Sequence, residues 1–323
     1  MIRTITLLLL ASIALTGCKK NPPADWSAPA LGISQSDERE CTLASHEVTL
    51  DLTDAGATRT VRLINDRQIT GVIESITTKL IDEQKTTKAA DLAEQLKRDK
   101  CSVELPKVGD AQFTSAQIYD QCSPSVLVFS GLYKCGKCAN WHAAPASGFV
   151  ITEDGIAVTN HHVLDKSNNE TYVAMTLDGE IYPVKEVLAA SKKDDVAIVQ
   201  LDLPQGVKLK PLAVAADAPV GSPITLISHP DRRFYTLTTG IISRYHTMAR
   251  GNAQSASVTI TADYARGSSG APVLNDRGAV VGIVASTQSV YYTNEGGKQE
   301  NLQMVFKQCI PSASLLKLID VKK

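Results

Sequence analysis

Between residues 114 and 306 the chain repeats one pattern of hydrophobic and polar positions. Short runs rich in Val, Ile, Leu and Thr are separated by turn residues, such as Asp154 with Gly155 and Asp178 with Gly179. Runs of this length at this spacing predict an all-β sandwich or barrel rather than alternating strands and helices. Twelve runs are candidate strands: 124–130, 147–152, 156–160, 171–177, 180–187, 195–201, 223–229, 235–245, 257–262, 271–275, 279–286 and 301–306.

A different pattern precedes these strands. Two alternating runs, 47–52 and 59–64, surround the turn-rich segment 53–58 and predict a hairpin. Between residues 72 and 98, hydrophobic residues recur three to four positions apart, which is the period of an amphipathic helix.

The change of pattern near residue 112 divides the chain into two regions. We expect a small α+β N-terminal module over 41–112, either a helical spacer or a binding domain. A mainly β domain over 113–323 should follow. Its last segment, Ser312 to Lys322, has hydrophobic residues at helical spacing and a serine that can cap it, so we expect a C-terminal helix.

The first residues have the features of an export signal. Residues 1–17 contain Arg3 and then an apolar run that is short for a membrane span. The sequence LTGC that ends at Cys18 resembles the bacterial lipobox, which implies cleavage before Cys18 and acylation of its thiol. An ordinary signal followed by a chance cysteine is the alternative.

Polar residues over 18–40 predict a flexible tether after that signal. By resemblance to Gram-negative lipoproteins, Lys19 favours the outer membrane, with the protein facing the periplasm. Two or more acyl chains on Cys18 would give stable anchoring to the membrane.

The charge balance excludes one class of partner. The chain has 33 basic and 34 acidic residues and a formal net charge of -1, so we expect no nucleic-acid binding. With 43% hydrophobic residues in 323, the chain can bury the core of one large or two modest domains.

Six cysteines remain after Cys18, an even number that predicts up to three disulfides in an exported protein. They are Cys41, Cys101, Cys122, Cys135, Cys138 and Cys309. Cys41 and Cys101 bracket the N-terminal module and can close it.

The pair Cys135 and Cys138 forms a CxxC, which can also be a redox pair or half of a metal site with His142. A thioredoxin-like site needs a βαβ context that the pattern lacks, and the sequence offers at most three ligands of the four that a structural zinc needs. We therefore expect a disulfide and no metal.

Three polar positions stand out among the candidate strands. His161 and His162 follow the run 156–160, Asp194 and Asp195 precede a strongly apolar run, and Ser269 lies in a glycine-flanked segment. A histidine, an aspartate and a serine in this order are the ingredients of a base, an orienting carboxylate and a nucleophile.

These segments resemble those of trypsin- and chymotrypsin-like serine proteases, especially the bacterial HtrA-type branch, over about residues 114–323. The serine motif is GSSGAP, with Ser269 at its centre. The histidine motif TNHHVL selects His162, and the aspartate that directly precedes a DxAxxxL strand selects Asp195 over Asp194. The resemblance implies two orthogonally packed β-barrels, with the catalytic residues in the cleft between them.

The same resemblance implies a role for each residue. His162 takes the proton of Ser269, and Asp195 holds the imidazole in the right tautomer. The backbone N–H groups of Gly267 and Ser269 form the oxyanion hole. Adjacent side chains on a strand point to opposite sides, so we expect His161 to be a packed neighbour rather than the base.

The specificity pocket is less clearly indicated. Asp263 lies six residues before Ser269, where trypsin-like members carry the acid that binds Lys or Arg side chains. A structural aspartate paired with Arg266 or with a backbone turn is the alternative. Ala285, Ser286 and Thr287 resemble the segment that pairs with the substrate backbone, and Thr287 would narrow the pocket entrance.

These observations together predict a serine endopeptidase that cleaves polypeptides in the bacterial cell envelope through an acyl-enzyme, without a cofactor. A catalytically silent protease-fold lipoprotein that acts as a binding module is the alternative. A thiol-redox or metal protein centred on Cys135 and Cys138 is a third possibility.

Two features of the HtrA-type branch and its relatives are missing from the sequence. About 36 residues follow Thr287, so we expect no PDZ domain. No IVGG-like start precedes Val126, so we expect no activation by cleavage. The oligomeric state stays open.

Overall fold

The computed structural model of the chain describes residues 45–52, 57–216, 218–250, 253–296 and 298–320. The described residues all belong to one compact unit. The expected signal peptide, the acylated Cys18, the tether and Cys41 lie outside the described residues.

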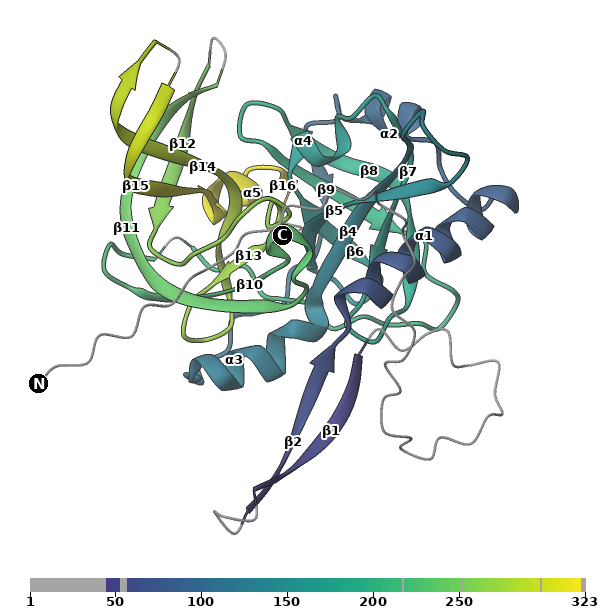
Figure 1. Ribbon diagram of the computed structural model, residues 1–323, viewed down its shortest axis with the longest axis horizontal. Helices are drawn as coiled ribbons and strands as arrows, with labels where there is room; N and C mark the ends of the chain where they lie inside the picture. The colour runs from purple at the N-terminus through teal and green to yellow at the C-terminus, as the bar shows by residue number, and fades with distance from the viewer. Residues whose placement is uncertain (1–44, 53–56, 217, 251–252, 297, 321–323) are drawn as a thin grey trace, which may run out of the picture. The chain divides into compact units, whose positions relative to one another are not determined.

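The first half of the β domain is a closed antiparallel barrel of six strands (Figure 1). Hydrogen bonds join the strands in the order β4, β5, β6, β9, β8 and β7, and β7 pairs with β4 to close the barrel. Their bounds are β4 (Val126–Lys134), β5 (Trp141–Val150), β6 (Ile156–Thr159), β7 (Asn169–Met175), β8 (Ile181–Ser191) and β9 (Val196–Leu201).

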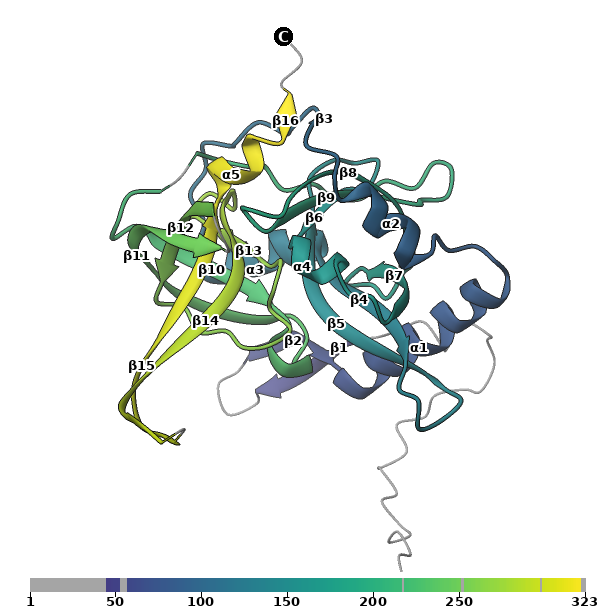
Figure 2. The same cartoon turned by 90° about the horizontal axis from the view of Figure 1, so that it is seen from above.

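The second half is another closed antiparallel barrel of six strands (Figure 2). Its order is β10, β11, β12, β15, β14 and β13, and β13 closes it on β10. The bounds are β10 (Pro223–Ser228), β11 (Thr236–Arg250), β12 (Ala253–Ile260), β13 (Pro272–Leu274), β14 (Val280–Glu295) and β15 (Lys298–Pro311).

Each of the twelve predicted runs contains or overlaps one barrel strand, which confirms a mainly β, chymotrypsin-like double β-barrel. The hairpin of β14 and β15 is longer than predicted and extends away from the barrel (Figure 2). The side chains of β15 from Lys298 to Met304 are all exposed, so that part of the strand has no buried face that would produce a hydrophobic pattern.

Alternation along the strands divides the core into clusters. On β4, Leu127 and Phe129 belong to the cluster inside the first barrel, whereas Val126 and Val128 point the opposite way. That second cluster also contains Ile227 and Ile310 from the second barrel, so it packs the barrels together. A third cluster fills the second barrel.

The N-terminal segment begins with the predicted hairpin, β1 (Ser45–Leu52) with β2 (Ala57–Ile64). The single helix predicted over 72–98 is wrong, because the structure has α1 (Asp66–Asp82) and α2 (Ala89–Gln95). The hydrophobic period lapses between them, and Gln84 there has a φ of 57° that ends α1.

Both helices pack on the first barrel rather than around a core of their own. Ile69 and Ile73 of α1 are fully buried in the cluster between the barrels, and Leu92 of α2 is fully buried in the first barrel's cluster. α3 (Ser115–Cys122) and the 3₁₀ turn η2 (Ser123–Ser125) lead into β4.

The C-terminal helix is shorter than predicted. α5 spans Ser312–Leu316 with Pro311, not Ser312, at its N-cap. The chain then forms β16 (Ile319–Asp320), which pairs in parallel with β3 (Cys101–Ser102). Leu318 and Ile319 therefore bury their side chains beside the N-terminal segment instead of continuing a helix.

Among the described residues, no helix combines the length and the apolar character that crossing a membrane requires.

Candidate active site

His162 lies on a short helix rather than at the end of a strand. After β6, Asn160 is the N-cap of α4 (His161–Leu164), which carries both histidines. The prediction that the side chains of His161 and His162 alternate as on a strand is therefore wrong. Successive side chains on a helix point about 100° apart, so the two imidazoles still face different directions. Only one of the two imidazoles can face Asp195.

The pairing of β6 with β9 places α4 beside Asp195. Thr159 lies opposite Ala197, so the residue after β6 meets the residue before β9. The carbonyl of Asp195 accepts hydrogen bonds from the backbone N of His161 (3.2 Å) and from Nδ2 of Asn160 (3.0 Å). These contacts hold the aspartate in a left-handed conformation, with a φ of 61°.

His162 and Asp195 form a close, partly shielded pair. The imidazole Nδ1 lies 2.9 Å from Oδ2 and 3.0 Å from Oδ1 of Asp195, and the backbone N of His162 also donates to Oδ1 at 3.0 Å. The Asp195 side chain is 8% exposed and the His162 side chain 40%. A neutral ring that donates its Nδ1 proton to the carboxylate keeps Nε2 as an acceptor.

The neighbouring Asp194 has a structural role. Its Oδ2 accepts a hydrogen bond from Ser191 (3.1 Å) and its Oδ1 accepts one from Ser255 of the second barrel (2.7 Å). Asp194 therefore links the two barrels, whereas Asp195 faces the histidine.

Ser269 approaches from the second barrel, in the loop before β13. Two contacts with β5 of the first barrel hold that loop: the backbone N of Ser147 donates to the Ser269 carbonyl (2.8 Å), and Oγ of Ser147 donates to the Gly267 carbonyl (2.9 Å). Ser269 and His162 line the same cavity.

The hydroxyl of Ser269 does not meet the imidazole in this structure. Its Oγ lies 3.5 Å from the carbonyl of Ala285, at the limit of a hydrogen bond, and it makes no hydrogen bond to His162. In unliganded sites such contacts are often long and tighten only with substrate.

The loop before Ser269 leaves two backbone donors unused. Neither Gly267 N nor Ser269 N donates to an acceptor in the described part of the chain. The Arg266 carbonyl accepts from Asp231 N, so the N–H across the same trans peptide, that of Gly267, points the opposite way. Gly267 has a φ of 98°, and a Cβ there would lie 2.4 Å from the His229 carbonyl oxygen, so only glycine fits.

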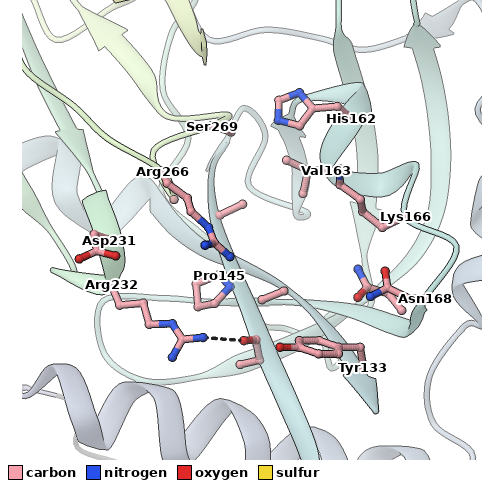
Figure 3. Close-up of a pocket in the computed structure, with 15 residues that line it drawn as sticks. Tyr133, Pro145, His162, Val163, Lys166, Asn168, Asp231, Arg232, Arg266 and Ser269 are labelled. Atoms are coloured by element: carbon pink, nitrogen blue, oxygen red, sulfur yellow. Dashed lines mark hydrogen bonds between the residues drawn. The ribbon is translucent and has the colours of Figure 1, made fainter. Parts of the chain in front are cut away.

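The cavity beside His162 and Ser269 has a volume of about 600 Å³ and a basic lining (Figure 3). Lys166, Arg232 and Arg266 lie around it, against one carboxylate from Asp231. Asp231 is paired with Arg233, and Arg232 donates to the Ala143 carbonyl at 3.2 Å.

The three cationic residues of this cavity were not predicted from the sequence. Lys166, Arg232 and Arg266 come from three segments far apart in the chain, and no motif connects them. The adjacent arginines Arg232 and Arg233, shortly after His229, were the one feature of the sequence that could have indicated a basic cavity.

The residues expected to set specificity do not line this cavity. The Asp263 carboxylate is exposed and lies 3.3 Å from Nζ of Lys307, so its partner is that lysine rather than Arg266. Tyr264 is buried, and its hydroxyl lies 2.7 Å from the Ser286 carbonyl oxygen and 2.8 Å from that of Gln308. Ala285 is buried, whereas Ser286 and Thr287 are exposed on β14.

Two further histidines near the site are buried. His161 is buried and does not line the cavity, which suits a packed neighbour rather than a base, and burial lowers its pKa. His229 is fully buried between the barrels, and burial lowers its pKa to about 4. Its Nε2 donates to the Leu127 carbonyl (3.0 Å), and its Nδ1 accepts from Tyr235 N (3.0 Å).

The structure contradicts any disulfide among the five cysteines that it describes, since each is a free thiol. Cys122 and Cys309 lie in different hydrophobic clusters, and burial raises the pKa of Cys122 to about 11 and that of Cys309 to about 12. A bond between Cys41 and Cys101 would involve a residue outside the described ones.

Cys135 and Cys138 lie close together in the loop between β4 and β5, with His142 beside them. A hydrogen bond from the backbone N of Lys137, and then one from Cys138, lower the pKa of Cys135 to about 7. This group is the one cluster of potential metal ligands found among the described residues.

Comparison with known proteins gives the same picture as the motifs. Residues 146–283, which include His162, Asp195 and Ser269, match the family described as a trypsin-like peptidase domain. The chain is 33% identical over 178 residues to serine protease HTRA1B of Danio rerio, which covers 52% of this chain and 36% of that protein.

Two bacterial relatives give similar values. The putative serine protease HhoA of Synechocystis sp. is 33% identical over 153 residues, covering 44% of this chain and 36% of the relative. The probable periplasmic serine endoprotease DegP-like of Brucella suis is 30% identical over 184 residues, covering 55% and 32%. The chain thus spans about a third of the length of these relatives, and the matches confirm a resemblance to trypsin-like serine proteases of the HtrA type.

Proposed function

We propose that this protein is a serine endopeptidase that uses His162, Asp195 and Ser269. The observation that carries the proposal is the pair of His162 and Asp195, held by three hydrogen bonds, on the same cavity as a serine in a GxSG turn. The similarity to proteins named serine proteases supports it.

The reaction follows from the protons that these groups hold. Oγ of Ser269 attacks the peptide carbonyl carbon while Nε2 of His162 takes its proton, and Asp195 stabilises the resulting imidazolium. The N–H groups of Gly267 and Ser269 stabilise the oxyanion. The C–N bond breaks as His162 returns the proton to the leaving amine, and water then hydrolyses the acyl-enzyme by the same route.

We infer that the substrate is a polypeptide with acidic side chains near the cleaved bond. Lys166 and Arg266 are exposed at the cavity, and neither forms an ion pair with another described residue. The Asp263 carboxylate is paired with Lys307, so this geometry gives less support to a preference for substrates with Lys or Arg side chains.

The test is hydrolysis of an unfolded polypeptide by the purified full chain in detergent, compared with Ser269→Ala. We expect cleavage by the wild type and loss of it in the variant, with mass spectrometry of the products reporting the residues around each cut. Cleavage that persists in Ser269→Ala would come from another serine or from a contaminant.

A silent binding module is the second candidate, and one observation favours it. Ser269 Oγ lies near the Ala285 carbonyl rather than near His162. If the site is silent, the wild type will bind an unfolded polypeptide without cleaving it, and Ser269→Ala will bind equally well.

We also propose that the protein is anchored by a lipid on Cys18 in the cell envelope and faces the periplasm. The LTGC sequence supports the anchor, and the similarity to a relative named as probably periplasmic supports the location. Labelled palmitate should enter the wild type and not Cys18→Ala.

A further inference from the structure

The loop that joins β4 to β5 brings two thiols and an imidazole together. Sγ of Cys135 lies 3.6 Å from Sγ of Cys138, and Sγ of Cys138 lies 3.1 Å from Nε2 of His142. All three ligand atoms lie within 4.8 Å of one another, and the side chains are partly or fully exposed. The proposed peptidase chemistry does not use any of them.

We propose that Cys135, Cys138 and His142 form a zinc site. Thiolate and imidazole ligands suit Zn²⁺, whereas Ca²⁺ and Mg²⁺ prefer oxygen ligands. Binding removes the proton from each thiol, so two thiolates balance the charge of the ion.

The distances fit a shared metal better than a disulfide. A disulfide requires sulfurs about 2.05 Å apart. A tetrahedral zinc with ordinary bond lengths separates two sulfurs by about 3.8 Å and a sulfur from an imidazole nitrogen by about 3.6 Å. The two sulfurs here are 3.6 Å apart, close to the spacing on zinc, whereas Sγ of Cys138 and Nε2 of His142, at 3.1 Å, would have to separate by about 0.5 Å. A disulfide would also involve the two sulfurs alone, whereas a zinc ion would bind the imidazole of His142 as well.

The loop backbone supports this arrangement. Gly136 has a φ of 72°, a left-handed turn in which the next peptide, at Lys137, donates its N–H to Sγ of Cys135 at 3.4 Å. On the other side of the loop, Nζ of Lys134 donates to the Ala139 carbonyl and lies 4.1 Å from the centre of the Trp141 ring. The loop is therefore shaped before any ion binds.

The fourth position of the ion faces solvent. No other Cys, His, Asp or Glu among the described residues joins the three ligands, so a water completes the tetrahedron. Three protein ligands with a water are the open form of zinc site.

The site lies next to a wall of the candidate active site. His142 is opposite Tyr133 in the register of β4 and β5, and their rings are 5.7 Å apart. Tyr133 lines the cavity with Ser269 (Figure 3). Ala143 lines it too. Zinc would tie the loop to β5 at the end of the hairpin and hold this wall in place.

The test is zinc binding by the full chain in detergent, reduced and freed of metal with a chelator. We expect one zinc per wild-type chain, with affinity at least about tenfold weaker in His142→Ala and weaker still in Cys138→Ser. Cys101→Ser and His246→Ala are matched controls, a half-buried thiol and a partly exposed histidine away from the loop, and should bind like the wild type.

Two outcomes would overturn the proposal. One is a reduced wild type without stoichiometric zinc, and the other is wild-type affinity in both His142→Ala and Cys138→Ser. This test does not depend on proteolysis, so its result is separate from that of the proposed function.

Cobalt and hydrogen exchange provide two further readouts. Cobalt(II) should give intense tetrahedral bands with thiolate charge transfer that weaken in Cys138→Ser, and a weak octahedral spectrum would exclude this ligand set. Zinc should slow amide exchange over residues 133–146 in the wild type and not in Cys138→Ser. Unchanged exchange on stoichiometric binding would place the ion elsewhere.

Discussion

At the scale of single residues, the position of Asp195 in the site is constrained by its backbone conformation and by its hydrogen bonds. Its φ of 61° is uncommon for a residue other than glycine, and its carbonyl and carboxylate are both held by residues 160–162. Asp195, which orients the imidazole of His162, is thus held in place by the same segment that carries His162.

This position predicts a loss of activity in Asp195→Asn. The amide keeps the size of the side chain but favours the wrong imidazole tautomer, so we expect kcat to fall on the order of 10⁴-fold, the effect of this change in chymotrypsin-like enzymes. Steady-state kinetics with a peptide that the wild type cleaves will measure this fall in kcat.

Asp194→Asn is the matched control. Its carboxylate contacts Ser191 and Ser255 rather than a histidine, so it should lose some stability and retain kcat. Equal losses of kcat in the two variants would contradict the roles given to them.

His229 predicts how stability depends on pH. Its folded pKa of about 4 is below the ordinary value of 6.5, so the unfolded chain binds the proton more tightly. Stability from this residue is fully present above pH 6.5 and is lost as the pH falls to about 4, by about 3 kcal/mol.

Urea unfolding at a series of pH values tests this prediction with His229→Gln. The variant should be less stable at pH 7, and its stability should vary less between pH 6.5 and pH 4. An unchanged slope would mean that another group causes the acid sensitivity.

The sequence predicted some of these residue contacts and not others. A serine between glycines and a histidine before Val163 are local patterns, so they were visible. The contact of Asp263 with Lys307 was not, because it joins positions 44 residues apart and depends on strand register. The free thiols were not visible either, since cysteine count alone does not show which sulfurs meet.

At the scale of elements, α1 braces two walls of the cavity. Oε1 of Glu74 accepts the backbone N–H of Ala143 on β5 (3.0 Å), and Oδ1 of Asp66 accepts that of Phe234 (3.0 Å), which lies two residues after Arg232. The N-terminal helix thus contributes to the site without supplying a reacting group.

This bracing predicts an effect of Glu74→Ala on substrate binding. Loss of the acceptor leaves the Ala143 N–H unpaired in a part-buried position, which costs about 1 to 3 kcal/mol of stability. We expect KM for peptides to rise more than kcat falls. Asp82→Ala, an exposed acid at the end of the same helix, should change neither, and a purely kcat effect of Glu74→Ala would contradict the bracing role.

Elements with a buried face were predictable and the others were not. The barrel strands bury alternate residues, so their period was visible in the sequence. The outer part of β15, from Lys298 to Met304, is exposed and carries no such period. The end of α5 was predicted too late in the chain, because Leu318 and Ile319 have the spacing of a helix but pack beside β3.

At the scale of the whole molecule, the two barrels meet at the site, and the charge around it differs from that of the chain. The formal net charge is -1, whereas the cavity has three cationic side chains and one carboxylate. A local positive field in a cleft attracts acidic substrate and weakens with salt.

This field predicts that Arg266→Gln lowers kcat/KM for an acidic peptide by about two- to fivefold at low salt, since an exposed ion pair contributes up to about 1 kcal/mol. A neutral peptide should be unaffected. Lys208→Gln, which removes a lysine outside the cavity, is the control. Equal effects on both peptides would contradict an electrostatic role.

The fold class could be predicted from the sequence, but the assembly of the site could not. The strand pattern and three motifs indicated two barrels and a triad. The contacts that bring the barrels together at Ser147 and Ser269 are backbone hydrogen bonds between distant segments, which leave no trace in the sequence.

The proposed triad is tested most directly by labelling with a fluorophosphonate, which reacts with a serine only when its base and oxyanion hole are assembled. We predict that the folded full chain is labelled on Ser269, that Ser269→Ala is not labelled, and that His162→Ala reacts far more slowly while His161→Ala reacts normally. A folded wild type that takes no label, or a label that persists in Ser269→Ala, would contradict the proposed triad.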